Sequence, residues 1–571
     1  ATMRFLLAAT LSAVVVVHAT TLEDVCTPSY VKSKLPSDSV YPGITLDRSF
    51  VEANPVYNST TSGSAIFPTQ SIDYCNVTLA YSHDGRNDTV KLRFWLPRPD
   101  RFERRYLSTG GADYYINQGV QQLPGGVIYG AVSGSTDGGF GSFDTGVDEV
   151  LLLANGTLNH QHVYMFGYQA HHELSTIGKS LTRRFFNMTA SDKLYAYYQS
   201  CSEGGREGWS QVQRFGEEWD GAVIGAPAIR YSFQMVYHLW ANVVEKTLNY
   251  FPSQCEIAAI VNQTIQACDG YDGRQDGVVS RSDLCKLHFD LNSTIGARYY
   301  CAAEGDVPVQ NSTISAAAVE VFRTILGGMK DLQGNQVYLS YQPGALFYDA
   351  QSTYNSTTGL WGLDINSFGG EYVARFLDLV DADNLSSLDN VTYDTLKDWI
   401  QQGWQLYEDS LHTAWPDLTP FHRGGGKILH YHGEQDGSIP TASSVHYYES
   451  VRRVMYPDLA YNASTAALGD WYRLFLVPGA SHCMNNDLQP NGPFPQTSLA
   501  TLIRWVEEDL VPVTLNGTVL SGSFEGQEQQ ICAWPLRPMW SLNGTEMHCE
   551  YDQASLDTWT WDFDAFKMPV Y

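Results

Sequence analysis

Residues 199–205 read Gln-Ser-Cys-Ser-Glu-Gly-Gly and lie between a strand-like stretch and a helix-forming stretch. A sharp turn at such a junction lifts the side chain at its apex clear of a sheet and points the helix N-terminus toward it. Ser202 stands at the apex, with the small residues Ser200 and Gly204 two positions to either side. The pattern predicts a nucleophilic serine, although glycine usually stands where this chain has Ser200. Turns of this composition also occur for structural reasons alone, so the assignment depends on partner residues elsewhere.

Strand-like and helical stretches alternate around this turn. The expected strands are residues 90–96, 105–109, 194–199, 221–225, 427–432 and 472–477, and the expected helices are residues 205–215 and 499–510. Strands that alternate with helices indicate βαβ units and therefore an α/β fold with a doubly wound, mostly parallel sheet.

The segment from residue 228 to 420 has a different character. It contains helical patches at residues 256–267 and 313–326 and loops rich in cysteine and glycine, without a buried strand pattern. We interpret it as a large inserted lid domain. The first part of the core is then residues 20–227, and residues 421–571 form its second part with a C-terminal extension.

The composition restricts the class of partner. The chain has 571 residues, of which 43% are hydrophobic and 17% charged, as in ordinary globular proteins. Its 35 basic and 62 acidic residues give a formal net charge of −27, which repels phosphate backbones and anionic lipid. No apolar run after the first residues is long enough to span a bilayer. We therefore expect neither nucleic-acid binding nor membrane binding, and a small molecule as the partner.

The N-terminus indicates export. Arg4 precedes the apolar stretch 5–17, and Val17-His-Ala19 offers a cleavage site, so residues 1–19 read as a signal peptide; a buried N-terminal strand is the alternative. All ten cysteines follow this segment, and their even number suits a disulfide framework in a secreted protein. Sequons for N-linked glycans are abundant. Examples are Asn58, Asn76, Asn87, Asn155, Asn187, Asn262, Asn292, Asn311, Asn355, Asn390 and Asn543.

Two later loops supply partners for Ser202. Asp436 and His482 each follow a predicted late strand, in the order acid then histidine that a Ser-His-Asp triad requires on this kind of sheet. The acid holds the imidazole in the correct tautomer, and the imidazole takes the serine proton. Glu434 is an alternative acid, but at two residues' distance it should point across the loop. Two histidines on the preceding strand are expected to pack structurally: His430 and His432.

Two cysteines flank the proposed triad. Cys201 directly precedes the serine, and Cys483 directly follows the histidine. A disulfide between them would join the two loops and limit misplacement of groups that must meet within hydrogen-bond distance. Chance adjacency in a cysteine-rich chain is the alternative.

Acyl transfer also requires donors for the oxyanion. The backbone N–H of Glu203, immediately after the nucleophile, is one expected donor. The other should come from the glycine pair after an early strand, Gly110 or Gly111, which could otherwise be a plain turn.

The Cys-Ser, Asp and His-Cys pattern resembles the tannase and feruloyl esterase family of α/β-hydrolases, and most closely its tannase (tannin acyl hydrolase) branch. The resemblance spans nearly the whole mature chain and is carried by residues 201–208, 211–214, 225–227, 273–287, 417–421, 430–434 and 566–571. It implies a secreted esterase that hydrolyses galloyl ester and depside bonds of tannins. A feruloyl or chlorogenate esterase with the same triad is the nearest alternative, and a non-catalytic secreted calcium- or glycan-binding protein is a more distant one.

The same resemblance implies a structural Ca²⁺ site in the lid. Residues 268–278 present three carboxylates in a turn-rich loop, and calcium accepts such oxygens together with main-chain carbonyls in irregular geometry. The implied ligands are the side chains of Asp269, Asp272 and Asp276 and the main-chain oxygens of Arg274 and Val278. An acidic surface loop without metal is the alternative.

The remaining cysteines follow the family layout. A Cys268–Cys285 disulfide would enclose the acidic loop, and the resemblance implies the pairs Cys26–Cys75 and Cys532–Cys549, with Cys255 and Cys301 left as the last pair. Spacing alone allows other pairings. The oligomeric state is not indicated by the sequence.

Overall fold

The computed structural model describes residues 20–61, 65–542 and 544–571, so the expected signal peptide (residues 1–19) and Asn543 lie outside the described residues. A nine-stranded sheet organises the described chain, in the order β1-β2-β3-β5-β4-β8-β9-β14-β15. These strands are β1 Ile44–Thr60, β2 Ser71–His83, β3 Val90–Pro97, β4 Arg105–Thr109, β5 Ala131–Thr136, β8 Tyr195–Cys201, β9 Gly221–Gly225, β14 Lys427–Gly433 and β15 Tyr472–Val477.

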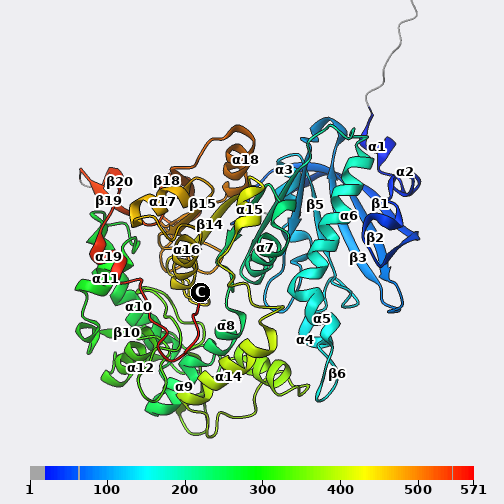
Figure 1. Cartoon of the computed structure of the whole chain (residues 1–571). Coiled ribbons are helices and arrows are strands. Elements are labelled where there is room, and N and C mark those ends of the chain that lie inside the picture. Colours follow the sequence, from blue (N-terminus) through cyan, green and yellow to red (C-terminus); the bar gives the residue numbers. More distant parts are fainter. Residues whose placement is uncertain (1–19, 62–64, 543) are drawn as a thin grey trace, which may run out of the picture.

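The sheet has a parallel part and an antiparallel extension. Strands β5, β4, β8, β9, β14 and β15 pair in parallel, whereas β1, β2 and β3 form an antiparallel ribbon that joins the parallel part through β5. The ribbon lies at the right of Figure 1, beside the N-terminal helices. The predicted α/β fold with a mostly parallel sheet is therefore confirmed.

Helices cover both faces of the sheet, which gives two apolar cores. On one face Tyr198 and Ile224 belong to the same apolar core as residues of helices α6 (Ala170–Phe185), α7 (Glu203–Arg214) and α16 (Ala442–Met455). On the other face the neighbouring residues Tyr197 and Val223 pack against α18 (Ser498–Glu508). The period of two along each strand sends successive side chains to opposite faces.

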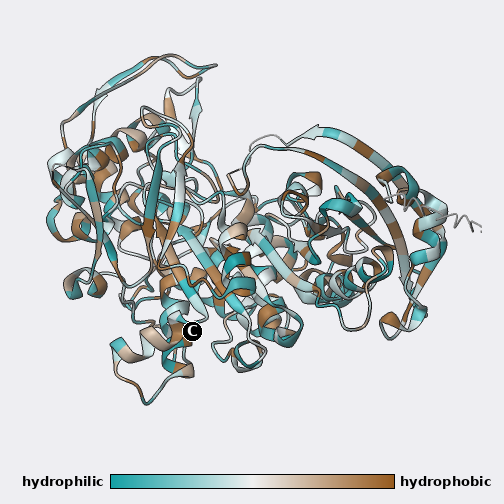
Figure 2. Cartoon of the chain, turned by 90° about the horizontal axis from the view of Figure 1, so that it is seen from above, coloured by the Kyte–Doolittle hydropathy of each residue, from teal (hydrophilic) through white to brown (hydrophobic). Residues whose placement is uncertain are grey.

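Three strands of the sheet were not predicted. The edge strand β1 is largely exposed and polar, and it pairs with β2 through two register shifts. Strand β5 is fully buried, yet its sequence Ala-Val-Ser-Gly-Ser-Thr lacks the apolar run by which buried strands are recognised. In Figure 2 brown and teal residues alternate along the long curved strands near the N-terminal trace. The alternation is present, but the polar positions outnumber the apolar ones in β1.

Residues 228–420 contribute helices and two separate hairpins, and none of the nine strands of the described main sheet comes from this segment. They form the green-to-yellow part at the bottom and left of Figure 1. Their helices are α8 Tyr231–Tyr237, α9 Trp240–Leu248, α10 Gln254–Cys268, α11 Ser282–His288, α12 Ala316–Leu326, α13 Ser367–Glu371, α14 Tyr393–Tyr407 and α15 Thr419–Arg423, and their hairpins are β10–β11 (Arg298–Cys301, Gln310–Thr313) and β12–β13 (Ser352–Asn355, Leu360–Leu363).

The C-terminal part lies against both regions. Strands β16 (Pro493–Phe494), β17 (Thr514–Val519) and β18 (Glu528–Cys532) form a small sheet beside β15. Phe566 near the terminus packs against Phe233 of α8 and Trp404 of α14. The extension therefore contacts both the sheet and the helices of residues 228–420. No helix among the described residues is long and apolar enough to cross a membrane.

Gly205 lies where α7 crosses β9, and a methyl group there would meet backbone. An ideal Cβ would stand 2.5 Å from the carbonyl oxygen of Gly225 and 2.9 Å from Cβ of Pro227. Gly205→Ala should therefore lower the free energy of unfolding by about 1–3 kcal/mol through overpacking. Thermal denaturation checks this, with Gly362→Ala as control, because no atom lies within 4 Å of the corresponding Cβ position. Equal melting temperatures for the two variants would contradict the expectation.

Candidate active site

Ser202 occupies the strained turn between β8 and α7. Its backbone angles are φ 67° and ψ −127°. Residues other than glycine rarely adopt this conformation, which costs about 1–3 kcal/mol of backbone strain. Two hydrogen bonds to the end of β9 hold it: the Ser202 N–H donates to Gly225 at 3.0 Å, and the N–H of Ala228 donates to the Ser202 carbonyl at 3.2 Å. The turn is thus fixed by the neighbouring strand.

The small residues around Ser202 are required by close contacts. A Cβ on Gly204 would stand 2.0 Å from Oγ of Ser200 and 2.7 Å from the carbonyl oxygen of Gly111. The Gly204 N–H donates to that same Gly111 carbonyl at 3.1 Å. The first turn of α7 therefore rests directly on the loop that follows β4.

The three predicted residues Ser202, His482 and Asp436 meet at the carboxyl ends of β8, β14 and β15. Oγ of Ser202 lies 2.9 Å from Nε2 of His482, and Nδ1 of His482 lies 2.7 Å from Oδ2 of Asp436. The Asp436 side chain is fully buried, whereas Ser202 is half-buried and the His482 side chain is 21% exposed. The hydroxyl and the imidazole can therefore reach a ligand, and the carboxylate cannot.

The carboxylate of Asp436 accepts four hydrogen bonds, two at each oxygen. Oδ1 accepts the backbone N–H groups of Ser438 at 2.8 Å and Ile439 at 2.9 Å, and Oδ2 accepts His482 and, at 3.1 Å, Nε2 of His432. Burial alone would raise the pKa of this carboxyl group. The charge of His482 and the hydrogen bonds from His432 and His482 outweigh burial, so the pKa lies below its ordinary value and Asp436 is ionised.

The same environment shifts the pKa of His482 in the opposite direction. Burial would lower its pKa, but the charge and the hydrogen bond of Asp436, together with the charge of Asp113, outweigh burial and hold the pKa above the ordinary value. Asp113 lies in the loop after β4 with a positive φ of 56°. Its charge therefore adds to that of Asp436 from a second loop, and Asp113 was not predicted from the sequence.

The disulfide between Cys201 and Cys483 joins the serine turn to the histidine loop. It connects residues 282 positions apart in the sequence, with Cα atoms 6.0 Å apart. The other four disulfides pair Cys26 with Cys75, Cys255 with Cys301, Cys268 with Cys285, and Cys532 with Cys549. All five are the expected pairs.

Glu434, the alternative acid, serves another purpose. It is fully buried, accepts the N–H of Ser282 at 3.1 Å, and forms an ion pair with Arg537. It therefore connects Ser282 and the C-terminal extension to the end of β14, and none of its printed partners is His482.

The structure changes the predicted set of oxyanion donors. Glu203 is the first residue of α7, so its N–H has no acceptor within the helix and remains suited to an oxyanion. The N–H of Gly111, in contrast, donates to Oε2 of Glu207 at 2.7 Å. Gly111 is therefore not available as a donor, and that prediction is wrong. Gly110 remains a prediction. The buried Glu207 was missed because nothing in a helical Glu-Gly-Gly-Arg-Glu stretch indicates a backbone partner.

The acidic loop 269–278 is folded largely around its own backbone. Oδ1 of Asp269 accepts the N–H groups of Asp276, Gly277 and Val278 at 3.0, 2.9 and 3.3 Å, and Oδ2 of Asp276 lies 3.1 Å from Nε of Arg274. Burial raises the pKa of Asp272 to about 7. Among the described residues, no three His, Cys, Asp or Glu side chains converge as a complete metal cage.

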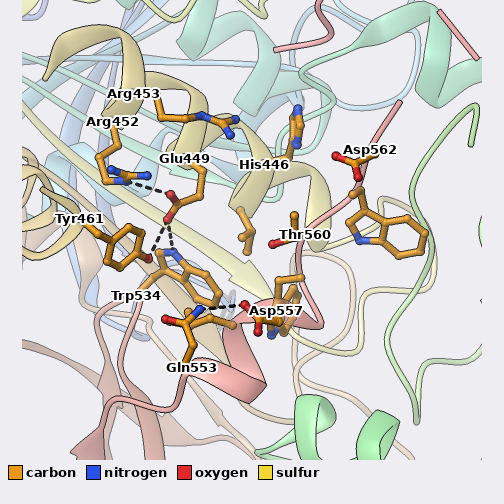
Figure 3. Close-up of a pocket in the computed structure, with 14 residues that line it drawn as sticks. His446, Glu449, Arg452, Arg453, Tyr461, Trp534, Gln553, Asp557, Thr560 and Asp562 are labelled. Carbon is orange, nitrogen blue, oxygen red and sulfur yellow. Dashed lines mark hydrogen bonds and ion pairs between the residues drawn. The ribbon is translucent and has the colours of Figure 1, made fainter. Parts of the chain in front are cut away.

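A separate cavity of about 260 Å³ lies between α16 and the C-terminal segment (Figure 3). The described residues that line it include no member of the triad. Its central carboxylate, Glu449, receives hydrogen bonds from Arg452, Tyr461 and Trp534, as the dashed lines show. Its carboxylate is thus already paired, and the candidate active site is the partly exposed Ser202–His482 pair.

Comparison with known proteins agrees with this geometry. The sequence profile described as "Tannase and feruloyl esterase" matches residues 75–554. The chain belongs to the tannase and feruloyl esterase family. It is 48% identical over 580 aligned positions to a tannase of Aspergillus oryzae, which covers 97% of both chains. It is 30% identical to a probable feruloyl esterase of Arthroderma benhamiae, over 82% of this chain and 84% of that one.

Solved structures give the same result for the fold. The tannin acyl hydrolase from Aspergillus niger superposes with a TM-score of 0.95 at 59% identity, covering 97% of this chain and all of that chain. Feruloyl esterase B from Aspergillus oryzae has a TM-score of 0.69 at 23% identity, over 91% of this chain and all of that one, which supports the shared fold alone.

The disulfide next to Ser202 should matter more for turnover than one far from it. Replacing both Cys201 and Cys483 by serine should reduce kcat for ester hydrolysis by about 10-fold or more, because the strained turn and the imidazole lose their covalent link. The matched control replaces Cys532 and Cys549, a disulfide between β18 and β20 (Glu546–Glu550). The control should keep kcat, and equal losses of kcat in both double variants would contradict this role.

Proposed function

We propose that this protein is a secreted serine esterase that hydrolyses galloyl ester and depside bonds of tannins and releases gallic acid. The observation that carries the proposal is the hydrogen-bonded series Ser202–His482–Asp436 at the carboxyl edge of the sheet. The 48% identity to a tannase over 97% of the chain supports tannins as substrates.

The geometry supports a two-step acyl transfer. Oγ of Ser202 attacks the ester carbonyl carbon while Nε2 of His482 takes the hydroxyl proton, and the carbonyl oxygen becomes an oxyanion. His482 then returns the proton to the departing alcohol, which leaves the acyl group on Ser202. A water molecule then takes the place of the serine. It attacks the acyl carbon while His482 takes its proton, the bond between that carbon and Oγ breaks, and His482 returns the proton to Oγ, which releases the free acid and restores the Ser202 hydroxyl.

The surrounding groups have defined tasks in this scheme. Asp436 keeps the Nδ1 hydrogen of His482 directed at Oδ2, so Nε2 faces the serine with its lone pair. The N–H of Glu203, at the positive end of α7, donates to the oxyanion. Gly110 is the proposed source of a second donor, since the N–H of Gly111 is used by Glu207.

Export and glycosylation are part of the same proposal. All ten cysteines are paired in five disulfides, as expected for an oxidising compartment. Of the sequon asparagines named above that fall in the described chain, Asn76 is half-buried and the others are exposed. Exposed asparagines are accessible to the glycosylation machinery, which supports N-linked glycans on this protein.

A structural Ca²⁺ ion in the lid is also proposed. The donor chemistry fits, because Oδ2 of Asp272 is buried without a hydrogen-bond partner and burial next to other carboxylates raises the pKa of Asp276 to about 6. The side chains of Asp269, Asp272 and Asp276 and the main-chain oxygens of Arg274 and Val278 would hold the ion. The ion would neutralise these charges and fix the loop that the Cys268–Cys285 disulfide encloses.

The decisive experiment compares substrates. The kcat/KM for methyl gallate should exceed that for methyl ferulate by about 100-fold, because a pocket built to hydrogen-bond several hydroxyl groups leaves polar groups unpaired when a methoxy group replaces one. Ser202→Ala is the control and should lose about 10⁴-fold in kcat without a change in melting temperature. Preference for ferulate would assign the chain to feruloyl ester hydrolysis, and absence of Ser202 labelling by a fluorophosphonate would exclude an esterase.

Calcium removal should destabilise the lid. At a free Ca²⁺ concentration of 100 times Kd, binding to the folded state contributes about 2.7 kcal/mol, so chelation should lower the melting temperature of the wild-type protein. Asp272→Asn, which weakens the proposed donor set, is the matched variant and should respond less to the chelator. A wild-type melting temperature that is the same with and without chelator would count against the site.

A further inference from the structure

The carboxylate of Asp436 is connected to a second histidine and, through it, to the interior of the protein. Nε2 of His432 lies 3.1 Å from Oδ2 of Asp436 and 3.1 Å from the carbonyl oxygen of Ile439. Nδ1 of His432 lies 2.7 Å from Oγ of Ser444, which belongs to α16. We expected His432 to pack structurally, but it shares one carboxylate oxygen with the imidazole of His482.

The contacts continue beyond Ser444. Its Oγ lies 2.8 Å from Nε2 of His430, and Nδ1 of His430 lies 2.9 Å from the hydroxyl group of Tyr472 on β15. His430 and His432 are two positions apart on β14, so both point to the face that α7 and α16 cover. Ser444 lies over the strand and bridges the two imidazoles. All four side chains are buried.

The chemistry of these groups gives the series one direction. Both partners of His432 Nε2 are acceptors, so this nitrogen carries a hydrogen. In the direction that ends at Asp436, Nδ1 of His432 accepts from the Ser444 hydroxyl, whose oxygen accepts from Nε2 of His430. Nδ1 of His430 finally accepts from the Tyr472 hydroxyl. Burial holds the pKa of His430 well below its ordinary value, in agreement with a neutral ring.

We propose that Tyr472, His430, Ser444 and His432 form a buried relay of positioning residues. The relay orients Asp436 and weakens the electrostatic effect of its carboxylate on the catalytic imidazole of His482. The inference rests on the proposed esterase chemistry. Each hydroxyl or N–H in the series donates toward the carboxylate, and consecutive donors of this kind strengthen one another in a low-dielectric interior. The relay therefore competes with His482 for the negative charge on Oδ2.

The relay has two consequences for the reaction. The carboxylate is held in its plane by donors on both oxygens, so the imidazole of His482 keeps its orientation toward Ser202. In addition, less negative charge acts on His482, so its neutral form, which is the form that accepts the serine proton, persists to lower pH. The other charged or titratable groups that act on the pair are Asp113 on His482 and Tyr341, which faces Asp436 from the lid.

Two substitutions at residue 432 separate orientation from simple packing. His432→Gln places an amide nitrogen where Nε2 stands and keeps the donor to Asp436. His432→Asn keeps an acceptor for Ser444 near the position of Nδ1 but has no donor that reaches Asp436. His432→Asn should lower kcat for methyl gallate by about 10- to 100-fold, the factor of one charge-assisted hydrogen bond, with KM nearly unchanged. His432→Gln should restore most of the lost turnover.

The pH profile and the proton spectrum provide readouts that packing alone would not change. In His432→Asn the acid limb of kcat/KM should move to higher pH, because Asp436 then acts more strongly on His482. The far-downfield proton resonance of the His482 Nδ1–H bond to Asp436 should shift in the same variant. Ser444→Ala should show a smaller displacement of both readouts, and Tyr472→Phe a smaller one still, because each lies further along the series.

His412→Asn is the matched control. His412 is also buried, and its Nε2 contacts a serine hydroxyl, that of Ser232, at 3.1 Å. It should keep the wild-type pH profile and proton resonance. The relay is refuted if His432→Asn retains wild-type kcat, or if the Asn and Gln variants lose activity equally while the acid limb and the resonance stay in place. Loss of the proposed function is a different outcome, in which the wild-type protein itself fails to hydrolyse esters.

Discussion

The strained backbone of Ser202 is the constraint on which the site depends. A residue with φ 67° and ψ −127° persists only where its surroundings determine its position from several sides. Here the end of β9 holds the peptide groups, the loop after β4 accepts a hydrogen bond from the first turn of α7, and a disulfide joins residue 201 to the histidine loop. The strain is small compared with the sum of these contacts. Its effect is to present a hydroxyl group at the edge of the sheet, in line with an imidazole carried by a different strand.

The same edge concentrates buried polar groups, each of which would be costly if unpaired. Asp436 is acceptable in the interior because four donors surround it, and Glu207 because it takes the N–H of Gly111. Glu434 is likewise neutralised by Arg537. Three carboxylates within a few residues of the catalytic loops thus serve three purposes, and only their partners distinguish them.

The partners of these polar groups explain which features could be predicted from the sequence and which could not. Strand β15 and the order Ser202, Asp436, His482 were predictable. An apolar run is visible in the local sequence, and the order of the loops follows from the handedness of βαβ units. Strand β5 was not predictable, since its small polar residues become buried only through their neighbours in the sheet. Glu207 and Gly111 were not predictable as a pair, because the two residues are 96 positions apart and no periodic pattern connects them. Long-range contacts of single polar groups leave no pattern in a sequence.

His432 illustrates the limit more sharply. Two histidines that alternate on a buried strand look like core residues, and by burial they are. What the pattern omits is that a buried imidazole is expected to satisfy both ring nitrogens. Nε2 of His432 does so with the carbonyl oxygen of Ile439 and with the carboxylate that His482 also needs. The need to satisfy buried hydrogen-bonding groups, more than hydrophobic packing, connects the interior of the sheet to the reacting groups at its edge.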